Sequence, residues 1–197
     1  MKIPLLIAAV AALTFPSTVI AEEAAKFVAQ GHVWVDGDST LHRYHLDART
    51  FDASMTVADG AADLLADIRA KRVTSLGFSV RVGALSSGET GLDENLRKAL
   101  KADAHPLITF NMQSFDVKDA SNFILHGKLE VAGVARDIAL PVGVANREGA
   151  LHFTGKVPLR MTDFEVQPPV LMLGTLKTAD AVDVGFDLTF APPAPKP

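Results

Sequence analysis

The sequence predicts an all-β fold, an antiparallel β-barrel of about eight strands with one or two short helices. Apolar and polar residues alternate with a period of two in segment after segment, which is the period of a strand. The connections between these segments are short and rich in Gly, Asn, Asp and Ser, as in hairpins. Only two segments have helical spacing, and both are short. Strands with one apolar face must cover it, by closing a barrel or by forming a sandwich.

Composition excludes several classes of function. The chain has 197 residues, 48% of them hydrophobic and 21% charged, which fits one globular domain. It has no cysteine, so disulfides, thiolate metal sites and a cysteine nucleophile are excluded. The net charge is −4 and aromatic residues make up only 7%, so we expect no nucleic-acid partner.

Residues 1–21 are predicted to be a signal peptide. Lys2 precedes an apolar run, Ile3–Phe15, that is too short for a typical membrane-spanning helix. Val19 and Ala21 suit positions −3 and −1 of a cleavage site. We therefore expect cleavage near Ala21, a periplasmic or secreted protein and no stable membrane insertion, with an uncleaved anchor as the alternative.

Nine segments of the following domain, residues 22–190, carry the strand alternation. They are Phe27–Val35, Thr40–Leu46, Phe51–Val57, Leu76–Val82, Ile108–Met112, Phe123–Val131, Ile138–Val144, Leu151–Val157 and Val182–Phe190. Residues 119–122 and 146–149 have the composition of hairpin turns. The order of the segments therefore predicts an antiparallel meander.

Two segments break the strand period, and the C-terminal end of the chain fits neither element. Leucines at helical spacing predict helices over Ala61–Lys71 and Gly91–Lys101, and the second has acidic residues first and basic residues last, which suits the helix dipole. We expect these helices to cap or plug the barrel ends. Residues 191–197 contain four prolines and are predicted to be a disordered or extended tail.

No motif of catalysis or metal binding stands out. The six histidines are dispersed, and His42 and His45 would point to opposite faces of a strand. The sequence has no HExxH and no G-x-S-x-G motif. We predict no catalytic residue, no metal site, no cofactor and no enzyme, with a histidine-based haem or metal site kept as an alternative.

The apolar faces of the strands are the remaining candidate site. Alternation places eight large side chains on one interior: Phe78, Val80, Phe110, Met112, Leu125, Leu129, Phe153 and Phe186. A barrel of about eight strands is just wide enough to be filled by side chains or to hold one small ligand. These residues therefore predict either an apolar ligand pocket or a filled core.

The segment before and within the second predicted helix suggests a gate. A Ser/Gly/Thr loop, Ser86–Gly91, precedes a helix whose apolar side carries Leu92, Leu96 and Leu100. Lids come from less stable segments because they must open. A helix that gates the barrel and a helix that only plugs it both fit. The loop hydroxyls fit either a mobile connection or contact with an anionic head group.

Four motifs in order resemble the YceI-like family, exported lipocalin-like proteins associated with polyisoprenoid binding. They are residues 38–45, residues 91–110 with His105-Pro106-Leu107-Ile108-Thr109-Phe110, residues 125–138 and residues 159–164 with the closing strand. Ala135 and Glu165 depart from the commoner family pattern of Thr and Gly. The resemblance implies a non-enzymatic carrier of an apolar lipid such as an isoprenoid quinone or a polyprenyl lipid.

Three hypotheses follow for the function. The first is a soluble exported carrier or sink that holds a long apolar lipid inside the barrel. The second is a non-catalytic secreted interaction or stress protein with a filled barrel, and a homodimer is also considered. The third is the histidine-based haem or metal-binding protein. A large closed apolar cavity would favour the first.

Overall fold

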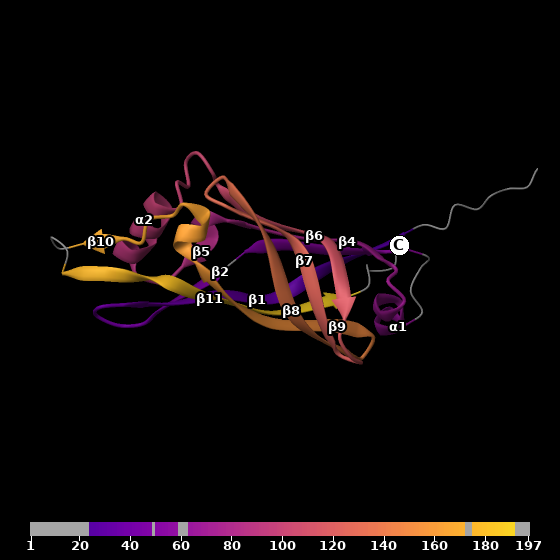
Figure 1. Ribbon diagram of the computed structural model, residues 1–197. Coiled ribbons are helices and arrows are strands. Elements are labelled where there is room, and N and C mark those ends of the chain that lie inside the picture. The colour runs from indigo at the N-terminus through magenta and orange to yellow at the C-terminus, as the bar shows by residue number, and fades with distance from the viewer. Residues whose placement is uncertain (1–23, 49, 59–62, 172–174, 192–197) are drawn as a thin grey trace, which may run out of the picture.

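The computed structural model describes residues 24–48, 50–58, 63–171 and 175–191. Their strands form one antiparallel sheet that closes on itself, and the two helices lie at its opposite ends (Figure 1). The predicted signal peptide, residues 61 and 62 of the first predicted helix and residues 192–197 of the tail lie outside the described residues.

Eight strands form the closed barrel. In their order around it they are β1 (Ala25–Ser39), β3 (Phe51–Val57), β4 (Val73–Arg81), β6 (Leu107–Val117), β7 (Asn122–Val131), β8 (Val134–Arg147), β9 (Ala150–Arg160) and β11 (Leu176–Ala191). The barrel closes where β11 pairs with β1, from Val28 opposite Ala191 to Gly37 opposite Val182. Closure leaves neither β1 nor β11 as a free edge. The predicted all-β fold and antiparallel, lipocalin-like barrel are confirmed.

Three short strands lengthen one end of the barrel. β2 (Tyr44–Ala48) pairs with β1 beyond the part of β1 that pairs with β3, so β2 and β3 act as one interrupted strand. β5 (Leu85–Ser86) extends the line of β4 and pairs with β2. β10 (Val170–Leu171) pairs with the start of β11. This end of the barrel is therefore built from turns and short strands.

Most predicted strands are longer in the structure, and a clear local feature sets the bounds of two of the predicted strands. The predicted strand Thr40–Leu46 begins only at Tyr44, because Ser39 Oγ holds a turn: it accepts hydrogen bonds from the amides of Leu41 and His42 and donates one to the His42 carbonyl. β6 continues past Met112 to Val117, because a β-bulge between Met112 and Ser114 breaks the alternation without ending the strand.

Both predicted helices are present, at opposite ends of the barrel. α1 (Leu64–Arg69) is shorter than predicted and is capped by Asp63, whose carboxylate accepts hydrogen bonds from the amides of Leu65 and Ala66. α2 (Thr90–Ala99) ends before Lys101, which has a positive φ of 52°. Two short 3-10 helices, η1 (Val82–Ala84) and η2 (Met161–Phe164), lie near α2 at the lengthened end.

The packed core fills the half of the barrel next to α1. Ile68 of α1 is buried there. The fully buried side chains of this half are Met55, Val57, Phe123, Leu151 and Phe190. The ring of Phe153 meets that of Phe190 edge-on, with centroids 4.9 Å apart. The half of the barrel next to α2 is built differently.

Candidate ligand-binding cavity

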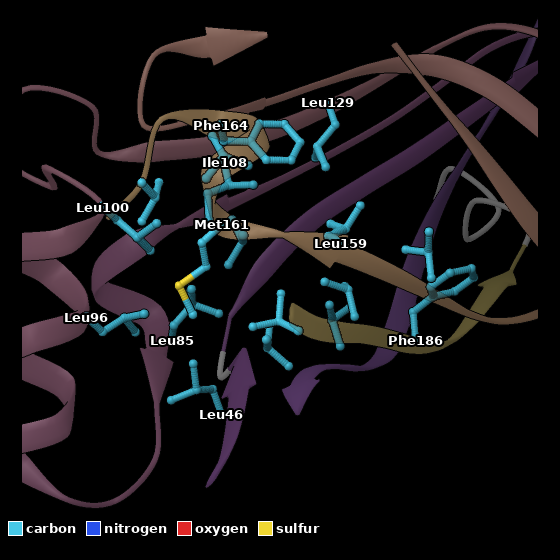
Figure 2. Close-up of a pocket in the computed structure, with 18 of the residues that line it drawn as sticks. Leu46, Leu85, Leu96, Leu100, Ile108, Leu129, Leu159, Met161, Phe164 and Phe186 are labelled. Atoms are coloured by element: carbon cyan, nitrogen blue, oxygen red, sulfur yellow. The ribbon is translucent and has the colours of Figure 1, made fainter. Parts of the chain in front are cut away.

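A cavity of about 520 Å3 occupies the half of the barrel next to α2. Leu46, Leu159 and Phe186 of the barrel and Leu96 of α2 point into this common space (Figure 2). Leu76, Leu125 and Phe153 line both this cavity and a void of about 10 Å3 behind it, which marks its inner end. Pockets for small molecules measure roughly 300–1,000 Å3, so the cavity is large enough to hold one.

The wall of the cavity is apolar except at one end. The polar side chains that line it are Ser39, His42, Tyr44, Glu89, Asn95, Arg160 and Thr178. They come from the β1–β2 turn and the strand residues on either side of it, from α2 and the residue before it, and from the ends of β9 and β11 next to α2. We call this end the mouth. The cavity therefore suits an elongated apolar molecule with one polar end.

Glycines opposite aromatic rings keep the lumen open. A Cβ at Gly155 would overlap the Phe186 ring, one at Gly127 the Phe110 ring, and one at Gly37 the Tyr44 ring. All three rings line the cavity. Because glycine has no side chain, each ring can lie against the barrel wall over a neighbouring strand instead of crossing the lumen.

Most of the interior residues predicted from alternation line this cavity. Seven do so: Phe78, Val80, Phe110, Leu125, Leu129, Phe153 and Phe186. Met112 does not: it lines the small void with Met55 and Ile68, at the packed end of the same interior. Alternation gives the face of a side chain but not its depth along the barrel, which explains the difference.

Several residues that line the cavity lie outside the segments with strand alternation or next to a turn. Leu85 lines the cavity from β5, and Met161 and Phe164 line it from η2. Val166 lines it from the segment that follows η2. Met161 and Phe164 are three residues apart, the spacing that puts side chains on one face of a 3-10 helix. Tyr44, the only tyrosine, begins a strand next to a turn. A period of two has no meaning in such short or turning segments.

α2 covers the mouth with its apolar side. Leu92, Leu96 and Leu100 all line the cavity. None of the ten residues of α2 is buried, and only Leu100, which follows the helix, is. α2 therefore covers the cavity with side chains that are only partly buried.

One carboxylate ties the start of α2 to the preceding loop. Asp93 accepts hydrogen bonds from Ser86 Oγ at 2.8 Å, from the Ser87 amide at 2.7 Å and from Ser87 Oγ at 2.8 Å. Desolvation alone would raise the pKa of Asp93, but these hydrogen bonds outweigh it and lower the pKa. Both serine hydroxyls donate hydrogen bonds to Asp93, so in this structure they do not donate to the anionic head group considered in the sequence analysis.

The histidines are separate in space. Within the described residues no three His, Asp or Glu side chains lie close enough to hold a metal ion. His45 instead lies on the outer face of β2, where Nδ1 is 2.7 Å from Asp36 Oδ1 and Nε2 is 3.3 Å from Asp47 Oδ1. His126 is 3.1 Å from Asp116 Oδ2. None of the helices in the described part of the chain is long and apolar enough to cross a membrane.

The described residues therefore form a closed antiparallel barrel of eight strands around an apolar cavity. The family model for the YceI-like domain matches residues 35–190, so the chain belongs to the YceI-like domain family. This confirms the resemblance of the four motifs. A search of curated proteins finds no match to this chain.

Three solved structures share the fold. BcnA of Burkholderia cenocepacia is 19% identical, with a TM-score of 0.66 over 81% of this chain and 95% of its own. A polyisoprenoid binding domain from Saccharophagus degradans, implicated in plant cell wall breakdown, is 10% identical, with a TM-score of 0.64 over 87% and 100%. A YceI protein of Campylobacter jejuni is 16% identical, with a TM-score of 0.60 over 76% and 84%.

Proposed function

We propose that the protein is a soluble exported carrier or sink that binds one long apolar lipid of the isoprenoid type inside its barrel, without catalysis. One observation carries the proposal: the cavity of about 520 Å3 is apolar along its length and polar only at the mouth. The polyisoprenoid binding domain with the same fold makes an isoprenoid chain the first candidate. An isoprenoid quinone and a polyprenyl lipid both have the required shape.

The hydrophobic effect supplies the affinity of such a site. Each methylene group removed from water contributes about 0.8 kcal/mol, so a chain with about ten buried carbons gains roughly 8 kcal/mol. Loss of translational freedom and ordering of the chain offset a large part of this gain. A dissociation constant in the micromolar range corresponds to a binding free energy of about −8.2 kcal/mol. To reach it after these costs, the ligand needs a chain longer than about ten carbons.

Tyr44 supplies a hydrogen-bond donor for the polar end of the ligand. Its ring lines the cavity near the mouth, over Gly37 of β1. Desolvation by burial raises the pKa of Tyr44, and the negative charge of Asp38 raises it further. The phenol therefore stays protonated at neutral pH and can donate to a carbonyl or hydroxyl oxygen of a head group.

We propose further that α2 gates the entry of the ligand. Two observations support a helix that can open. None of the residues of α2 is buried, and its start is held to the preceding loop by the hydrogen bonds of Asp93 with Ser86 and Ser87. A static plug is the competing interpretation. The signal peptide predicted over residues 1–21 supports export, and N-terminal sequencing of exported protein should return Glu22.

The central experiment is native mass spectrometry of the protein purified from its own host, followed by lipid extraction. We expect one isoprenoid lipid per chain. Val157→Trp should abolish the bound mass because Val157 lines the cavity, whereas Thr154→Trp, on the outer face of the same strand, should retain it. Circular dichroism checks that both variants fold. Wild-type protein that carries no isoprenoid lipid, and takes up none when it is offered, refutes the proposal.

A further inference from the structure

Two segments frame the mouth and extend beyond α2 in the same direction. They are the β1–β2 turn, residues 40–43, and the paired ends of β10 and β11 (Figure 1). Each carries an apolar side chain that is unusually exposed: Leu41 is 73% exposed and Val170 is 57% exposed. A single exposed apolar residue is ordinary, but two beside the opening of an apolar cavity call for an explanation.

Hydrogen bonds join these two segments into one rim. The Thr40 amide donates to the Lys177 carbonyl at 3.0 Å, and the Lys177 amide donates to Thr40 Oγ1 at 3.1 Å. On the other edge of β11, Val170 pairs with Lys177. Leu41 and Val170 therefore lie on segments that flank the same residue. Leu41 also lines the cavity, so the apolar surface of the rim continues into the lumen.

The rim also carries positive charge. Arg43 in the turn and Lys177 on β11 are exposed, and within the described residues neither makes an ion pair. Asp38, near the end of β1, is the acidic residue that precedes this turn, and its carboxylate accepts a hydrogen bond from the Ser39 amide. Glu89 lies across the mouth, before α2. Lysine and arginine beside exposed apolar residues suit the interface of an anionic membrane, because their charges attract acidic lipids while their stems reach apolar surface.

We propose that the rim formed by Leu41, Arg43, Val170 and Lys177 docks peripherally on an anionic lipid bilayer, so that the mouth of the cavity opens toward the acyl chains. The inference rests on the proposed function, since it gives an apolar ligand a path that avoids water. A stable protein partner fits the rim less well. Such a partner requires roughly 800 Å2 of contact surface on each side, whereas shallow insertion requires only a few apolar side chains.

Flotation of the full chain with vesicles tests the docking. The vesicles contain phosphatidylethanolamine and phosphatidylglycerol in equal parts. Val170→Asp should lower the partition coefficient about tenfold, because one fully buried valine contributes roughly 1.5 kcal/mol and each 1.4 kcal/mol is a factor of ten. Val28→Asp is the matched control: Val28 is 59% exposed but lies at the α1 end, so partitioning should not change. Arg43→Gln and Lys177→Gln should weaken binding to these vesicles and leave binding to pure phosphatidylcholine vesicles unchanged.

A second measurement separates docking from ligand binding. Farnesol binding is measured in solution without vesicles, and Val170→Asp should bind farnesol as the wild type does, because Val170 does not line the cavity. If wild-type protein does not bind farnesol, the proposed function is refuted, and the vesicle experiment still tests the docking by itself. Docking is overturned if wild-type protein does not float with the vesicles, or if Val170→Asp and Val28→Asp partition equally. It is also overturned if Val170→Asp only dissociates a dimer in sedimentation velocity, since the rim would then bind a second copy.

Discussion

Replacing one phenylalanine in each half of the barrel tests whether the interior is hollow. Phe186 lines the cavity and lies over Gly155, whereas Phe123 is only 2% exposed in the packed half and meets the Phe115 ring with centroids 6.5 Å apart. Both residues are on barrel strands and both side chains point inward. Phe186→Ala and Phe123→Ala therefore remove the same atoms from two different environments.

The two substitutions should differ clearly in stability. Phe123→Ala leaves a new cavity in a packed core, which costs about 3–5 kcal/mol. Phe186→Ala enlarges a cavity that already exists and loses contacts only on the wall side of the ring. We expect it to cost about 1.5 kcal/mol, the lower value for a buried apolar side chain. Since 1 kcal/mol corresponds to roughly 2–4 °C in Tm for a chain of this length, the two Tm values should differ by about 3–14 °C.

Urea and thermal denaturation of delipidated protein measure the stability difference. The same variants are then tested for binding of a C20 isoprenoid alcohol. Phe186→Ala should weaken ligand binding because part of the cavity wall is lost, and Phe123→Ala, where folded, should bind as the wild type does. Equal and large losses of stability for both variants, with no ligand bound by the wild type, would mean that Phe186 is core and that the lumen is filled.

Three further predictions address other parts of the molecule. Gly37→Ala should push the Tyr44 ring into the lumen and lower ligand affinity, whereas Gly83→Ala, where an added Cβ meets nothing within 4 Å, should leave it unchanged. If α2 is a gate, amides from Leu92 to Leu100 should exchange more slowly in hydrogen-exchange mass spectrometry when ligand is bound; exchange only by global unfolding, unaffected by ligand, would leave a static plug. The third concerns pH. The hydrogen bond with Asp36 raises the pKa of His45 above its ordinary 6.5, and the hydrogen bond with His45 lowers the pKa of Asp36 below its ordinary 3.8. The pair therefore stabilises the fold most between pH 3.8 and 6.5, and less as pH rises through the raised pKa of His45. The loss of stability in His45→Gln, followed by urea denaturation across pH, should be largest in that window, and a loss independent of pH would contradict the assignment.

Alternation and turn composition are local properties, and they were enough to predict an antiparallel all-β meander, which a barrel and a sandwich both fit. Side chains of a strand point alternately to its two faces, so Phe78, Phe110 and Phe186 could be assigned to one interior from their own segments. The helix between Gly91 and Lys101 was predicted on the same local grounds, and its apolar side does face the cavity. The bounds of β2 and β6 were missed where a Ser39 turn and a β-bulge override the period of two.

Whether the barrel is hollow depends on residues far apart in the chain. Gly127 lies against Phe110, Gly155 against Phe186 and Gly37 against Tyr44 only after the strands have paired in register. Depth along the barrel is likewise set by register, which is why Met112 falls in the packed half although its neighbour in alternation, Phe110, lines the cavity. At the mouth, the turn that carries Leu41 and the strand that carries Val170 flank Lys177, and Thr40 bonds to Lys177 across 137 residues of sequence. Pairing across such separations leaves no periodic signal in the chain, so only the tertiary structure decides it.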